Sequence, residues 1–233
     1  AQPWVIDRPV EPIRPGKMSA MARKQFNKNQ RELGIQWNTD WMSRMSDDKG
    51  SPFLERMTLF WHGHFACEPK VGFLIQQQME LLRMYALGNF KDLLIGVAQD
   101  PAMIRYLNNQ QNKKNAPNEN FARELLELFT IGRGHYTEQD IKEAARAFTG
   151  WSSNLKGEFV FRRFQHDYDS KSFMGKTGNF DGEDIIDIIL AKKETAYFIT
   201  KKIYRYFVND QIDEQIVNDL SQKLYQSNYH IGD

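Results

Sequence analysis

The sequence predicts a mainly α-helical protein: a single globular multi-helix domain with a small β-hairpin element and an extended N-terminal arm. Apolar residues recur every three or four positions over most of the chain, which is the period of an amphipathic helix. Only one short segment alternates apolar and polar residues as a strand does. Hydrophobic residues make up 41% of the 233 residues, so the chain can bury a sizeable core.

The N-terminal arm is predicted from its prolines. Four of the eight prolines fall within the first fifteen residues, which favours an extended segment without a core of its own. We therefore expect residues 1–18 to form this arm and residues 19–233 to form the helical domain. Polar and charged residues dominate 19–33 and predict a solvated helix. The run 38–40, Asn-Thr-Asp, is able to cap a separate short helix that carries Trp41.

Further helices follow from the apolar period, and their ends are marked by capping residues and glycines. The central pair is expected to begin at Asn118 and at Thr137, and Asp140, three residues after Thr137, is typical of a capping box. Alternation over 157–161 predicts the strand, whereas the glycine-rich stretch 164–182 is expected to be irregular. The predicted helices span residues 53–65, 71–85, 89–98, 101–107, 118–129, 137–148, 183–190, 195–207 and 216–225.

Composition argues against several classes of protein. A net charge of +1 gives no bulk field that favours nucleic acid or a membrane surface. No apolar run approaches eighteen residues, so no membrane span is predicted. The single cysteine, Cys67, excludes an internal disulfide framework. The chain has no signal peptide and both ends are abrupt, so we expect a processed or excised piece of a protein that continues past Asp233.

Ionisable residues lie beside the apolar stripes of the two central helices. Arg123 is four residues after Glu119 and four before Glu127, so one guanidinium can bridge both carboxylates. Glu124 adjoins the apolar stripe of the first helix, and Arg146 of the second helix is its natural partner. These five residues are interpreted as ion pairs that lock the two helices together. The functional alternative makes Glu124 an acid of raised pKa or a metal ligand.

Two histidine-bearing motifs are candidate metal sites. His62 and His64 would share a face on a strand but diverge on a helix, so they can bind one metal only if the helix breaks at Gly63. Otherwise His64 is a core histidine with a satisfied hydrogen bond. His166 and Asp167 form a loop pair that can ligate a metal, or in which the carboxylate orients the imidazole. The structural alternative is a turn that Asp167 caps.

Several motifs occur in series between about residues 50 and 210: 60–65 (FWHGHF), 85–90 (YALGNF), 117–128, 145–151 (ARAFTGW) and the pair 166–167. Together they resemble the bacterial DUF1800 family. The resemblance implies a mostly helical protein of a largely uncharacterised family whose members often carry export signals. It also implies an envelope partner, because such proteins often occur beside genes for DUF1501 proteins, which look like members of the alkaline phosphatase and sulfatase superfamily. The arm, up to about residue 20, has no counterpart in this resemblance.

Two classes of function remain open at this point. The first is a non-catalytic, exported protein (periplasmic, at the cell surface or secreted) that acts in an envelope or secreted assembly. The second is a metal-dependent enzyme, a hydrolase or oxidoreductase, with a divalent metal on His62, His64, His166 and Asp167 and with Glu124 as acid or base. Convergence of these side chains on one point would favour the enzyme.

Overall fold

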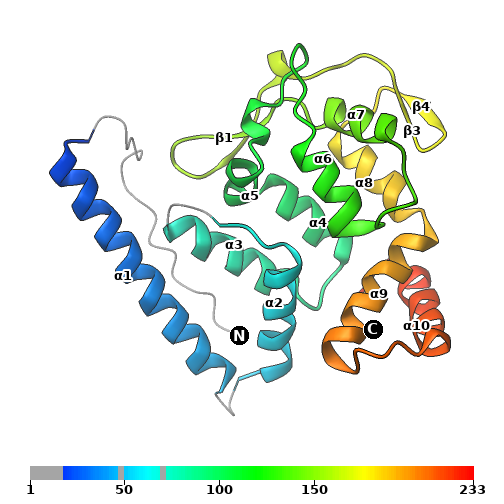
Figure 1. Ribbon diagram of the computed structural model, residues 1–233, viewed down its shortest axis with the longest axis horizontal. Helices are drawn as coiled ribbons and strands as arrows, with labels where there is room; N and C mark the ends of the chain where they lie inside the picture. The colour runs from blue at the N-terminus through cyan, green and yellow to red at the C-terminus, as the bar shows by residue number, and fades with distance from the viewer. Residues whose placement is uncertain (1–17, 47–49, 69–71) are drawn as a thin grey trace.

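The computed structural model describes residues 18–46, 50–68 and 72–233, and in these ranges the protein is mainly α-helical, as predicted. The described part contains ten α-helices and two small antiparallel sheets of two strands each (Figure 1). The arm expected over residues 1–18 lies almost wholly outside the described residues. No helix of the described ranges combines the length and the apolar character that a bilayer span needs.

The first helix, α1 (Ala20–Met45), is continuous, so the separate short helix expected after Asn38 is wrong. The hydroxyl of Thr39 donates to the carbonyl of Ile35 at 3.0 Å, four residues back, and so does not cap a new helix. Trp37 and Trp41, one turn apart, are the buried residues of α1, and their ring centroids lie 5.5 Å apart. Because these two indoles pack together, the helix continues through residues 38–40, although Asn-Thr-Asp favours a helix start.

Four helices follow and build the first part of the core. Trp61 of the first of them and Phe65, the residue just after it, stack on Phe90, and all three side chains are fully buried. Asn89 and Asp100 cap the last two helices through their side chains, as helix-start residues do. These helices are α2 (Pro52–His64), α3 (Gly72–Tyr85), α4 (Phe90–Gln99) and α5 (Pro101–Tyr106).

The central pair begins with α6 (Asn120–Glu124), which continues directly into a π-helix, η3 (Leu125–Thr130). In η3 the N–H of Ile131 donates to the carbonyl of Leu126, five residues back, at 3.2 Å. The second helix, α7 (Glu138–Ala147), starts with the predicted capping box.

Two hairpins follow α7, one expected and one missed. Strand β1 (Trp151–Ser153) pairs with β2 (Phe159–Phe161), which lies within the predicted strand. Strand β3 (Lys171–Phe173) pairs with β4 (Lys176–Gly178) inside the stretch expected to be irregular. Its two-residue turn has positive φ angles of 47° and 80° at Met174 and Gly175, the geometry of a type I′ hairpin turn.

Three helices close the described chain: α8 (Gly182–Leu190), α9 (Lys193–Phe207) and α10 (Glu214–Gln226). Helices α9 and α10 lie side by side, far from β1 and α5 (Figure 1). The buried Tyr229 ties the segment after α10 to the core, because its hydroxyl donates to the carbonyl of Leu190 at 2.8 Å. Its own carbonyl accepts from the N–H of Phe90 at 2.9 Å.

Candidate functional site

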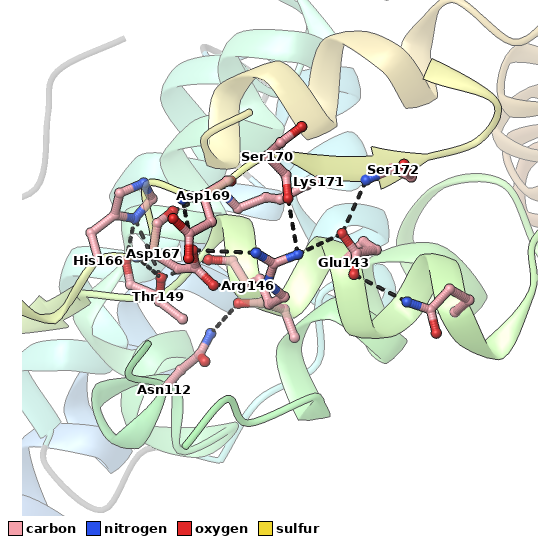
Figure 2. Close-up of polar contacts among 12 residues, drawn as sticks. Asn112, Glu143, Arg146, Thr149, His166, Asp167, Asp169, Ser170, Lys171 and Ser172 are labelled. Atoms are coloured by element: carbon pink, nitrogen blue, oxygen red, sulfur yellow. Dashed lines mark hydrogen bonds and ion pairs between the residues drawn. The ribbon is translucent and has the colours of Figure 1, made fainter. Parts of the chain in front are cut away.

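The densest polar cluster joins the end of α7 to the loop that leads into β3 (Figure 2). Arg146 donates two hydrogen bonds to Asp167, from Nε to Oδ2 at 2.7 Å and from Nη2 to Oδ1 at 3.3 Å. Its Nη1 donates to Glu143 Oε2 at 2.8 Å and to the carbonyl of Ser170 at 3.2 Å. Burial acts to raise the pKa of Asp167, but the hydrogen bonds from Arg146 and from the N–H of Asp169 outweigh it and hold the pKa below its ordinary value.

A buried lysine completes this cluster. Lys171 is 1% exposed, and its ammonium donates to the carbonyls of Asp167 at 2.6 Å and Asp169 at 3.0 Å. Burial lowers its pKa. Two cations, Arg146 and Lys171, therefore lie with two carboxylates, Asp167 and Glu143, and the charges balance.

His166 belongs to the same region but makes different contacts. Its Nδ1 lies 2.8 Å from the carbonyl of Thr149, which can only accept, so Nδ1 carries the proton. The hydroxyl of Thr149 donates to the carbonyl of Arg146 at 2.6 Å and accepts from the N–H of Asp167 at 2.8 Å. The imidazole is buried, with Phe161 and Tyr168 edge-on to it. Asp167 therefore binds Arg146, and the carbonyl of Thr149 orients the imidazole.

The turn beside His166 requires a glycine. Gly150 has a φ angle of +80°, and a Cβ there would lie 2.7 Å from the carbonyl oxygen of Arg162. The backbone of Gly150 donates to the carbonyl of Asn112 at 3.0 Å and accepts from the N–H of Arg162 at 2.8 Å. The glycine thus lets three chain segments meet beneath the imidazole.

The expected pairing of Arg146 with Glu124 is wrong. Arg146 binds Glu143 and Asp167 instead, because it shares a face of α7 with Glu143 and that face meets the loop before β3. Glu124 is half-buried and forms no salt bridge within the described ranges. Burial, with the charge of Glu127 as the second cause, raises its pKa.

The bridge expected across Arg123 is half right. Arg123 binds Glu119 at 3.2 Å, but its second partner is Glu138 of α7, at 2.9 and 2.8 Å, and not Glu127. Glu127 pairs with Arg133. The reason is the π-helix: Glu127 lies in η3, whose wider turns abolish the alignment of residues four apart.

His62 and His64 diverge, because α2 stays helical through Gly63. His62 is half-buried and stacks on Trp41, with ring centroids 5.9 Å apart. His64 lies in the core, where its Nε2 donates to the carbonyl of Phe129 at 3.0 Å. Its Nδ1 accepts from the ammonium of Lys202 at 3.3 Å. Burial, followed by the charge of Lys202, lowers the pKa of His64 to about 3, so the ring is neutral.

The structure therefore brings together only part of the predicted set. His166 and Asp167 lie near Arg146, whereas His62 and His64 contact other residues and Glu124 forms no salt bridge within the described ranges. Within the described ranges, no three His, Cys, Asp or Glu side chains are grouped so that they could hold a metal ion.

Three buried acids were not predicted from the sequence: Glu55, Asp100 and Glu143. Asp100 is 3% exposed, and its Oδ2 accepts from Gln78 Nε2 at 2.9 Å and from the N–H of Met103 at 3.1 Å. Burial raises its pKa to about 7. It lines a cavity of about 400 Å³ with Asp92 and Gln99. The only sequence signal was Asp-Pro at a helix start, which indicates a cap and says nothing of burial.

Comparison with known proteins adds one match. The model of a family described as "Protein of unknown function (DUF1800)" matches residues 7–233, which extends the resemblance at both ends. No curated protein matches the chain, and no solved structure matches it.

Proposed function

The chain belongs to the DUF1800 family, and from this premise we propose that it is a non-catalytic protein of an exported assembly, where it binds a partner protein through an apolar groove. The proposed partner is an envelope protein of the DUF1501 type. Export and this partner are inferred from the family resemblance, and the groove is inferred from the side chains described next.

The groove lies between α2, α9 and α10, and it is the observation that carries the proposal. Its volume is about 340 Å³, and apolar side chains dominate its walls. Several of them face solvent: Phe53 is 54% exposed, Val208 67% and Leu220 43%. Soluble proteins rarely leave a contiguous apolar surface uncovered, and such surfaces mark binding sites. The apolar lining includes Phe53, Met57, Phe207, Val208, Leu220 and Leu224.

The shape of the groove fits the side chains of a protein partner. Two packed helices, α9 and α10, form walls on which an amphipathic helix can lay its apolar face. Lys223 and His230 lie at the same groove and supply polar contacts beside the apolar ones. Buried apolar anchors surrounded by polar groups are the usual source of binding energy in protein interfaces.

The polar cluster of Figure 2 supports a non-catalytic role in a second way. In this cluster Asp167 is held by Arg146 and His166 by the carbonyl of Thr149. Outside it, His64 is held by the carbonyl of Phe129. Each of these side chains thus has a structural contact that accounts for its burial. The alternative is a metal-dependent hydrolase or oxidoreductase with Glu124 as acid or base. It requires the histidines and Asp167 to bind one metal, whereas in the fold these side chains contact different residues. Elemental analysis of the purified, untagged protein tests it, and one firmly bound metal per chain would favour it.

The groove is tested with a charge placed in it. Val208→Asp puts a carboxylate at a side chain that is 67% exposed and lines the groove, whereas Met84→Asp does so on α3 at a side chain that is also 67% exposed. We expect unmodified protein and Met84→Asp to bind a DUF1501-type protein from the same genome equally well. Val208→Asp should weaken binding at least about tenfold, which is about 1.4 kcal/mol.

Binding is measured by calorimetry, and circular dichroism checks that both variants fold. Absence of binding by the unmodified protein would reject the proposed partner. Equal loss in both variants would reject the groove.

A further inference from the structure

Arg105 is a half-buried cation that has no counter-ion among the residues that the structure describes. It lies in the last turn of α5, where its Nε donates to Ser153 Oγ at 3.3 Å and its Nη2 to the carbonyl of Asn154 at 2.7 Å. Both acceptors are neutral, and within the described ranges no carboxylate forms a salt bridge with Arg105. Burial lowers its pKa. In contrast, Arg83 binds Glu55 and Arg146 binds two acids.

The cavity beside Arg105 is basic. Its volume is about 670 Å³, and it lies between α5 and the β1–β2 hairpin. Three cationic side chains line it, and no carboxylate does so in the described part of the chain. The exposed Glu158 does not line it, but its carboxylate accepts from Nδ2 of the lining residue Asn154 at 2.7 Å. The polar lining consists of Arg105, Lys156, Arg162, Gln110, Ser153 and Asn154.

The backbone around this cavity is held in place before any ligand arrives. Asn154 Oδ1 accepts from the N–H of Lys156 at 2.9 Å and from that of Glu158 at 3.0 Å, which fixes the hairpin loop. The N–H of Arg162 donates to the carbonyl of Gly150 at 2.8 Å. A preorganised site loses little conformational entropy on binding.

Two further observations point to an anion. Gln110 lines the cavity, and its buried Oε1 accepts no hydrogen bond within the described ranges; a half-turn of the amide would present an N–H there. The N–H of Lys114 donates to the carbonyl of Gln165 at 2.9 Å, which ties the basic run 113–114 to the segment that directly follows the run 162–163. The fold therefore adds to the positive potential of this region, which attracts anions.

We propose that this cavity binds a phosphate or sulfate group, and that Arg105, Lys156 and Arg162 hold it. A guanidinium offers a planar fork of donors that matches tetrahedral oxyanions, and the buried charge of Arg105 is then neutralised. The cavity is also of the size that holds small organic ligands, so the group is carried by a phosphorylated or sulfated small molecule.

The test is a titration at constant ionic strength with four probes: inorganic phosphate, inorganic sulfate, glycerol 3-phosphate and glucose 6-sulfate. Calorimetry should show saturable binding of at least one ester, more tightly than its inorganic ion. Arg105→Gln should weaken that binding at least about tenfold. The matched control, Arg163→Gln, removes the same charge from an exposed neighbour that does not line the cavity and should leave the affinity unchanged.

Two outcomes would overturn the proposal. One is the absence of saturable binding by every probe. The other is an equal loss in Arg105→Gln and Arg163→Gln, which would reduce the effect to general charge attraction. Should Arg105→Gln fail to fold by circular dichroism, Lys156→Gln takes its place, because Lys156 is exposed and its backbone makes the turn contact. Lys156→Gln should weaken binding several-fold.

Discussion

At the scale of single residues, Arg146 joins α7 to the loop before β3 through two buried acids. It meets two carboxylates that are almost fully withdrawn from water, Asp167 and Glu143, and it also holds the carbonyl of Ser170. Burial acts to raise the pKa of Asp167, but the hydrogen bonds from this guanidinium and from the N–H of Asp169 hold that pKa below its ordinary value. Removal of the arginine would deprive the buried carboxylate of Asp167 of its bidentate partner and leave Glu143 without its ion pair.

We therefore predict that Arg146→Met destabilises the protein by about 2–4 kcal/mol, somewhat less than the loss of about 3–5 kcal/mol for breaking a fully buried ion pair, because the Arg146 side chain is 23% exposed. Urea unfolding measures the loss. Arg163→Met, at an exposed position in the segment between β2 and β3 that carries Asp167, should change the free energy of unfolding by less than about 0.5 kcal/mol. The double variant Arg146→Met with Asp167→Asn should recover part of the loss, since one orphaned charge is then absent. A loss as small as that of the control would show that the cluster does not stabilise the fold.

At the scale of elements, two glycines in helices have opposite surroundings. Gly63 lies inside α2, and a Cβ there would meet nothing within 4 Å. Gly182 begins α8, and a Cβ there would lie 2.5 Å from the ring of Phe148 and 2.7 Å from that of Trp151. The second glycine therefore sets how closely α8 approaches the end of α7, whereas the first has no packing role.

Alanine at these two positions should have opposite effects. Gly63→Ala should stabilise the protein by about 0.5–1 kcal/mol, because alanine restricts the unfolded chain and favours the helix. Gly182→Ala should destabilise it by about 1–3 kcal/mol through overpacking. Thermal unfolding measures both changes. Destabilisation by Gly63→Ala would mean that the backbone between His62 and His64 needs a freedom that a continuous α2 does not use.

At the scale of the whole molecule, two buried groups impose opposite pH dependences. The pKa of His64 is lowered from 6.5 to about 3, so the ring stays neutral in the fold while the unfolded chain takes up a proton. The free energy of unfolding therefore decreases as pH falls from about 6.5 to 3. Asp100, with its pKa raised from 3.8 to about 7, is protonated in the fold while the unfolded chain is ionised. The stabilisation of the fold that comes from protonated Asp100 is therefore complete below pH 3.8 and is lost as pH rises to about 7. Between about pH 4 and 6.5 the two slopes offset each other.

Replacing one of these two groups should reveal the pH dependence of stability that the other group causes. Asp100→Asn keeps an acceptor for Gln78, and its stability should rise with pH from about 4.5 to 6.5 more steeply than that of the unmodified protein. His64→Gln keeps a donor for Phe129, and its stability should fall relative to the unmodified protein over the same range. The change in slope is at most about 1.4 kcal/mol per pH unit for each group. Urea unfolding at three pH values measures it, and parallel profiles for all three proteins would contradict the assignment.

The helices were predictable because their apolar period is local, and the capping box at Thr137 needed only three residues of context. Long α1 was misjudged because Asn38 to Asp40 favour a cap, and only the packing of Trp37 and Trp41 overrides them. The β3–β4 hairpin was not predicted, because strands of three residues show almost no alternating pattern. In addition, Met174 occupies a turn position where asparagine or glycine is usual.

The site contacts depend on residues far apart in the sequence. Arg146 reaches Asp167, twenty-one positions away, whereas spacing rules look only one helical turn ahead. The sequence also cannot show that no carboxylate in the described part of the chain lines the cavity of Arg105, because the chain has many acids and only the fold determines which of them lie near this arginine. The burial of Asp100 belongs to the same class of long-range property.

The π-helix η3 has a consequence for insertions and deletions. Its carbonyls at Leu128 and Phe129 are held from outside by Lys202 and His64. Loss of one residue here would convert the π turn to an α turn and rotate all that follows by about 100° relative to α6. Phe129 would then leave His64, and the chain would enter α7 from another side. We therefore expect the number of residues between Glu124 and Gly132 to be inherited unchanged, even where their identities drift.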